Sequence, residues 1–194
     1  MAAEPPKPRA TVSGGPEGLE IVIPARRNLL VLLFLGIWLS GWVTGELSAL
    51  GDLLSGRPKA HEGFLLLWLT LWTMAGALAA YTWLWMLVGK ERILMGTSTL
   101  RIKRDVLGLG RTRTFALFRI RNLRVAPGPA GPRDAAAALR LAGLTGGLIV
   151  FEHEGKTVRF GASLDPAEAQ IIVERMQQRY AFPEPPTLHQ PGTK

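Results

Sequence analysis

Two long apolar runs stand out from an otherwise mixed pattern of hydrophobic and polar positions. The first covers residues 29–50 with Glu46 as its only charge, and the second covers residues 64–88 with none. Runs of 22 and 25 residues are long enough for a helix to cross a bilayer core of about 30 Å. We therefore predict an antiparallel hairpin of two transmembrane helices joined by a loop at residues 51–63. A signal peptide is the alternative for the first run, but the run is about twice the usual length and no A-x-A pattern follows it.

Short stretches of alternating apolar and polar residues follow the second run. Residues 99–106 are the clearest example, and this period of two is typical of a strand with one buried face. Residues 20–23, in the run EIVI before the first helix, offer a further strand. The other strands that we predict lie at residues 91–94, 113–118, 120–125, 147–152 and 157–160, with a tight turn at Glu154 and Gly155.

A capped amphipathic helix ends the patterned part of the chain. Asp165 is a good N-cap, Pro166 suits the first helical position, and Glu168 completes a capping box. The apolar face of this helix consists of Ala169, Ile172, Met176 and Tyr180. We therefore expect a membrane α-helical hairpin followed by an α+β domain, in which a small antiparallel β-barrel or curled sheet is covered by the helix.

The remaining segments have compositions that do not favour a packed core. Residues 1–19 and 183–194 are rich in proline and small residues, and we expect both to be disordered. Residues 127–146 form an insert in the domain at 89–182. The insert is either a short alanine-rich helix capped by Asp134 or a disordered segment. Residues 20–28 would join the domain through the extra strand.

The distribution of basic residues predicts an orientation. Arg26 and Arg27 precede the first run, and Lys90 and Arg92 follow the second, whereas the basic residues of the loop at 51–63 are balanced by acidic ones. Both termini are therefore expected in the cytoplasm. The net charge of +8 favours an anionic lipid surface as the neighbour.

The sequence offers little material for catalysis or for a cofactor. With no cysteine it excludes disulfides, thiolate nucleophiles and cysteine-type metal centres, and its three histidines lie in different regions. No nucleophile-elbow, metalloprotease or phosphate-loop motif occurs. We expect no enzyme, no catalytic residue, no cofactor and no metal site.

The order of elements and several local motifs resemble bacterial two-span inner-membrane proteins with a cytoplasmic pleckstrin-homology-like domain. The motifs are GKERI at 89–93, TLRIKRDV at 99–106, GLGRTR at 108–113, IRNLRV at 120–125, KTVRFG at 156–161 and LDPAEA at 164–169. The resemblance implies a fold and a setting in the inner membrane, and it implies no reaction.

The two runs contain tryptophans and small residues in regular spacings that membrane anchoring alone does not require. The pattern W-L-[ST]-x-W occurs once per run, and it places Trp42 and Trp72 at the same depth. Either they pack the two helices together, or they offer a face to a partner helix or an apolar cofactor. Two pairs of small residues, Gly41 with Gly45 and Gly76 with Ala80, either pack the hairpin internally or serve self-association or a partner helix.

Glu46 is the only ionisable residue within either run. It lies about 6 Å from the outer end, so its carboxylate either snorkels to the interface or pairs with Trp68 or Thr70 on the returning helix.

Five arginines lie close together in the predicted domain. Alternation places several of them on one strand face, which would contact anionic lipid headgroups, and the alternative is an ordinary solvated face. Few aromatic residues are interleaved with them, so nucleic acid is not an expected partner. The five are Arg111, Arg113, Arg119, Arg121 and Arg124.

These patterns favour an interaction or accessory protein of the inner membrane, whose partners are lipids and either another membrane protein or a second copy. One alternative is a lipid-sensing module that uses the arginine face. Another is an enzyme or oligomeric transporter with a site near Glu46 and the tryptophans, which two helices alone cannot enclose.

Overall fold

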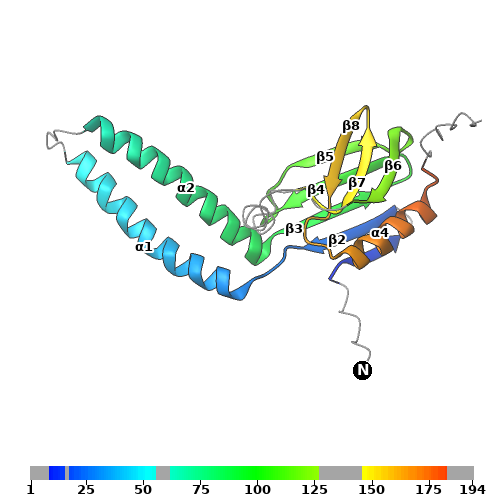
Figure 1. Cartoon of the computed structure of the whole chain (residues 1–194), viewed down its shortest axis with the longest axis horizontal. Coiled ribbons are helices and arrows are strands. Elements are labelled where there is room, and N and C mark those ends of the chain that lie inside the picture. Colours follow the sequence, from blue (N-terminus) through cyan, green and yellow to red (C-terminus); the bar gives the residue numbers. More distant parts are fainter. Residues whose placement is uncertain (1–8, 16–17, 56–61, 127–145, 183–194) are drawn as a thin grey trace, which may run out of the picture.

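A computed structural model describes residues 9–15, 18–55, 62–126 and 146–182. Two long helices, α1 (Leu29–Leu54) and α2 (Glu62–Val88), form a hairpin that projects from a body of strands and one helix (Figure 1). The α1 helix begins at its N-cap Asn28, whose side chain accepts hydrogen bonds from the backbone N–H groups of Leu30 and Val31 at 3.1 and 3.3 Å. It continues four residues beyond the predicted end at residue 50.

The first sheet is a five-stranded antiparallel meander in the order β1-β2-β3-β4-β5. Its strands β2 and β3 lie on either side of the helical hairpin in the sequence, yet they pair continuously from Leu19 opposite Met95 to Pro24 opposite Lys90. The hairpin is therefore inserted where a β-turn would otherwise join two neighbouring strands. The strands are β1 (Thr11–Gly15), β2 (Gly18–Pro24), β3 (Lys90–Met95), β4 (Thr99–Asp105) and β5 (Thr112–Ala116).

The second sheet has three antiparallel strands in the order β6-β7-β8, followed by the helix α4 (Pro166–Arg179). Glu154 and Gly155, both with positive φ, form the predicted tight turn before β8. The Glu168 carboxylate accepts a hydrogen bond from the Asp165 N–H at 3.3 Å, as expected of the capping box. The strands are β6 (Ile120–Val125), β7 (Ile149–His153) and β8 (Lys156–Phe160).

The core lies between the two sheets and α4. Phe115 of β5 packs edge-on against Phe151 of β7, with ring centroids 5.2 Å apart. The α4 residues Ala169, Ile172 and Met176 are buried, as predicted for the apolar face, while Tyr180 is the C-cap residue and packs partly buried against the core. The domain buries its apolar residues as one cluster between these layers.

The structure corrects two expectations about the domain. The strands do not close into a barrel, because the chain leaves β5 through a 3₁₀ turn at Leu117–Arg119 and starts a separate sheet. Residues 1–19 are not uniformly disordered, because Thr11–Gly15 forms a strand that pairs with the edge of β2. The tail at 183–194 and most of the insert at 127–146, including Asp134, lie outside the described residues.

Candidate functional site

The hairpin helices expose their apolar side chains. Only 11% of the most apolar stretch of α1 and 17% of that of α2 are buried, whereas a core helix of a soluble protein is covered on most sides. Both helices are long and apolar enough to cross a membrane. The hairpin thus presents an exposed apolar surface along both helices.

Tryptophans fill the seam between α1 and α2. The Trp42 ring covers Gly76 so closely that a Cβ atom built on Gly76 would lie 2.1 Å from the ring. The Trp83 indole N–H donates a hydrogen bond to the Leu32 carbonyl oxygen at 3.0 Å, and the Trp38 and Trp72 rings lie 6.3 Å apart. Trp42, Trp72 and Gly76 therefore pack the hairpin internally, which is the first of the two roles considered from the sequence.

Glu46 also lies in the seam. It is only 8% exposed, and its carboxylate accepts a hydrogen bond from the Thr73 hydroxyl of α2. This favours pairing with the returning helix, the second of the two alternatives, over snorkelling, because the facing helix covers the carboxylate. Thr70, which was considered as a partner together with Trp68, instead donates to the Leu66 carbonyl oxygen at 2.7 Å. The other Glu46 oxygen and the Trp42 indole nitrogen are buried without a hydrogen bond to the described residues.

The opposite side of α1 carries a stripe of small residues that faces away from α2. A Cβ atom built on Gly41 or Gly45 would meet no atom within 4 Å. The hydroxyls beside these glycines donate to carbonyls one turn back, at 2.9 Å for Ser40 and 3.0 Å for both Thr44 and Ser48. We call the exposed residues Ser40, Gly41, Thr44, Gly45 and Ser48 the small-residue face.

The predicted partner-helix residues thus divide between two sides of the hairpin. Gly41 and Gly45 are on the open small-residue face, whereas Trp42, Trp72 and Gly76 are in the seam and Ala80 is half-buried. The sequence interpretation missed the three hydroxyl residues. Their signal is the S-x₃-T-x₃-S spacing, which runs parallel to the G-x₃-G pair.

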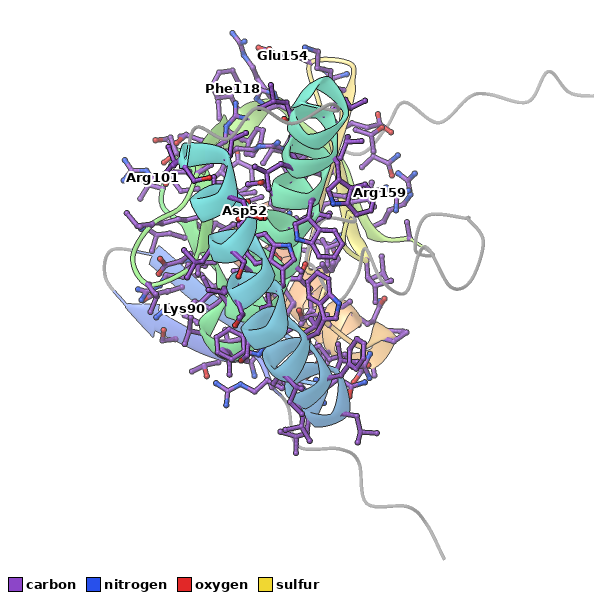
Figure 2. All side chains as sticks on the ribbon, turned by 90° about the vertical axis from the view of Figure 1, so that its left-hand side faces the viewer. Asp52, Lys90, Arg101, Phe118, Glu154 and Arg159 are labelled. Carbon is purple, nitrogen blue, oxygen red and sulfur yellow. The ribbon has the colours of Figure 1, made fainter. Side chains whose placement is uncertain are left out.

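The five predicted arginines do not share one face, because the 3₁₀ turn sends them to different sheets. Arg111 and Arg113 line a cleft between the sheets, together with Arg104 and Arg159, which the sequence interpretation missed. Arg119 pairs with Glu154. In Figure 2, Phe118, which neighbours Arg119, lies with Glu154 at one edge of the domain, well away from Arg159.

The other two arginines belong to the second sheet. Arg124 lies 3.8 Å from the Glu152 carboxylate, and Arg121 lines a hollow with Phe118 and Glu154. The five arginines therefore do not form one continuous face, and their contact with anionic lipid stays a prediction.

The signal for Arg104 was its place on β4. Arg104 lies two residues after Ile102 and four after Leu100, so its side chain is on the same face of the strand as these buried residues. A charged residue thus occupies a position where alternation predicts a buried apolar side chain.

The cleft also contains a buried carboxylate. Glu91 is 4% exposed, and its oxygens contact the Arg104 Nε atom at 3.5 Å and the Gly161 N–H at 2.8 Å. Burial raises the pKa of Glu91 above its usual value, while the charge of Arg104 and the backbone hydrogen bonds partly oppose this shift.

Over the described residues, no group of three or more histidine, aspartate and glutamate side chains is placed to hold a metal ion. Comparison with protein-family models, with curated proteins and with solved structures finds no match to this chain.

Proposed function

We propose that this chain is a non-catalytic interaction protein of the membrane, in which the small-residue face of α1 docks a transmembrane helix of another membrane protein. The order of strands followed by a capped helix is consistent with the pleckstrin-homology-like fold that the sequence resembles. We place the protein in a bacterial inner membrane, with both termini in the cytoplasm. The basic residues Arg26, Arg27, Lys90 and Arg92 at the domain end of the hairpin support this orientation.

One observation carries the proposal: Gly41 and Gly45 are open on the surface of α1 while α2 packs against the other side. Two glycines four residues apart let another helix backbone approach closely, which gives the van der Waals contact that drives helix association in lipid. Each glycine costs about 1 kcal/mol of helix stability relative to alanine. A helix that served only as an anchor would gain nothing from them.

The hydroxyls of the face fit the same role. Because Ser40, Thr44 and Ser48 donate their hydrogens to backbone carbonyls of α1, no hydroxyl hydrogen of theirs needs a partner in the lipid. Their oxygens remain able to accept a hydrogen bond from a polar residue on the docked helix. The face is therefore suited to a helix with small residues and at least one hydrogen-bond donor.

The proposal is tested by substituting Gly41→Ile and Gly45→Ile, with Ala77→Ile on the exposed surface of α2 as the matched control. We expect each glycine variant to remain in the membrane fraction and to lose the protein that co-purifies with the wild type in mild detergent. The control should retain it. Differently tagged copies of this chain in one cell show whether the docked helix comes from a second copy.

Retention of every co-purifying protein by both glycine variants would overturn the proposal. So would an equal loss in the Ala77→Ile control.

A further inference from the structure

The tight turn between β4 and β5 exposes two leucines. Leu107 is 70% exposed and Leu109 is 79% exposed, more than any other large apolar side chain in the described part of the domain. The turn from Val106 to Gly110 contains no charged residue. It therefore presents a small apolar tip on the surface of the domain.

Hydrogen bonds within the domain fix the backbone of this turn. Val106 and Leu109 exchange two backbone hydrogen bonds of 2.8 and 3.0 Å. Leu107 and Gly108 have φ values of 54° and 88°, and two positive values in succession are typical of a type I′ turn. The Lys103 ammonium group donates to the Gly108 carbonyl oxygen at 3.0 Å. The two leucines are thus presented on a regular hairpin and not on an irregular loop.

The turn itself does not explain the leucine at its first central position. Type I′ turns favour Asn, Asp or Gly there, because a positive φ is unfavourable for a bulky side chain. The turn between β7 and β8 also has two positive φ values, 52° at Glu154 and 75° at Gly155, and it has a charged residue where Leu107 stands. A leucine that is both strained and exposed indicates a contact outside the folded domain.

The β4–β5 turn lies at the end of the domain that joins the hairpin. Strand β3 begins at Lys90, directly after α2, and β4 runs back beside β3 until Asp105 pairs with Lys90. The turn starts at the next residue, so it projects beyond the row of the sheet that is nearest to α2. Figure 1 shows the connection between β4 and β5 at this end of the domain.

The base of the hairpin is packed firmly against the sheet. Trp85 and Met86, in the last turn of α2, are only 3% and 0% exposed. The Ala25 N–H donates to the Gly89 carbonyl oxygen at 2.9 Å, which ties together the two connections between the sheet and the hairpin. The position of the turn relative to the hairpin is therefore set by the fold.

We propose that Leu107 and Leu109 insert into the interface of the bilayer that the hairpin crosses, and so hold the domain against the membrane at a second point. The partner is the apolar region just below the lipid headgroups, where exposed apolar side chains are buried. The contact needs no anionic lipid, because the turn has no charge. This inference rests on the membrane location of the hairpin and not on the docking of a helix to α1.

The test uses the full chain in vesicles of phosphatidylcholine, which has no net charge. Because the chain has no cysteine, single cysteines can be labelled with the environment-sensitive fluorophore NBD. Leu107→Cys and Leu109→Cys sample the turn, and Ile171→Cys is the matched control at an exposed apolar position on α4. Leu84→Cys, at an exposed position on α2, is the positive control for the hairpin. Fluorescence is measured with and without phospholipid that has a spin label near the top of its acyl chain.

We expect the spin-labelled lipid to quench the labels at residues 107 and 109 at least about threefold more than the label at residue 171, because an inserted turn lies within reach of the upper acyl chain. Emission from the two turn positions should also shift to shorter wavelength than emission from residue 171.

Quenching at residues 107 and 109 that is no greater than at residue 171, while residue 84 is quenched, would overturn the proposal and leave the membrane hairpin standing. Emission at short wavelength without quenching by the lipid would place the turn against protein, and it would overturn the proposal as well. An absence of quenching at residue 84 would contradict the membrane hairpin itself and this inference with it.

Discussion

Glu91 shows how one residue links the stability of the domain to pH. Its carboxyl group is buried beside Arg104, and burial outweighs the favourable charge and hydrogen bonds, so its pKa is raised in the folded chain. The folded state therefore holds this proton to a higher pH than the unfolded state does. The contribution of Glu91 to stability is greatest below the unfolded value of about 4.5 and is lost as the pH rises through the raised value.

Replacing Glu91 by glutamine removes this titration while keeping an oxygen for the Gly161 N–H. We expect the free energy of unfolding of the wild type to fall relative to that of Glu91→Gln as the pH rises above about 4.5. Chemical denaturation of both proteins in one detergent, at a series of pH values, measures this difference. A difference that shifts in favour of the wild type with rising pH would contradict the burial argument.

Residue roles in the hairpin could be predicted only to within about one helical turn. The sequence identified Glu46 as the only charge in the first run, but its partner Thr73 lies three residues from Thr70, one of the two partners considered. Three residues correspond to about 4.5 Å of rise, and the predicted end of α1 was four residues short. Counting residues from a helix end that is uncertain by four residues cannot decide which of the two threonines faces Glu46.

At the scale of the helices, the glycines of the seam and of the small-residue face differ in whether they leave space for a side chain. Gly76 lies under the Trp42 ring, whereas Gly45 faces open space. Gly76→Ala should therefore destabilise the hairpin by about 1–3 kcal/mol through overpacking. Gly45→Ala should leave it unchanged or stabilise it by up to about 1 kcal/mol through helix propensity. Thermal unfolding in detergent, followed by tryptophan fluorescence, compares the two, and equal shifts would show that the seam is not packed as described.

Most strands were predictable because alternation marks a half-buried strand whatever its partner. The exception is β1, whose sequence TVSGG has one large apolar residue and forms a strand only by pairing with the edge of β2. The division into two sheets was not predictable either. Alternation says which face of a strand is buried, but not which strand lies beside it.

For the whole molecule, the pairing of β2 with β3 constrains the topology. Strand β2 leads into the hairpin, β3 follows it, and the two are hydrogen-bonded to each other. If the hairpin crosses a membrane, both its ends therefore lie on one side. Reporter fusions at residues 10 and 194 should give the same side, and a reporter at residue 57 in the predicted loop should give the other. Fusions that place residues 10 and 194 on opposite sides would be incompatible with the paired strands.

The central claim is that the small-residue face of α1 contacts another helix in the membrane. Because the chain has no cysteine, single cysteines can be introduced without a background. Ser40→Cys, Thr44→Cys and Ser48→Cys sample the face, and Leu71→Cys and Leu78→Cys sample exposed positions on α2. Membranes containing each variant are treated with a short bifunctional reagent that joins a thiol to a nearby amine or thiol, and the products are separated by size. We predict a discrete cross-linked product from the three α1 positions and none from the two α2 positions, whereas equal cross-linking on both helices, or none on α1, would contradict the account.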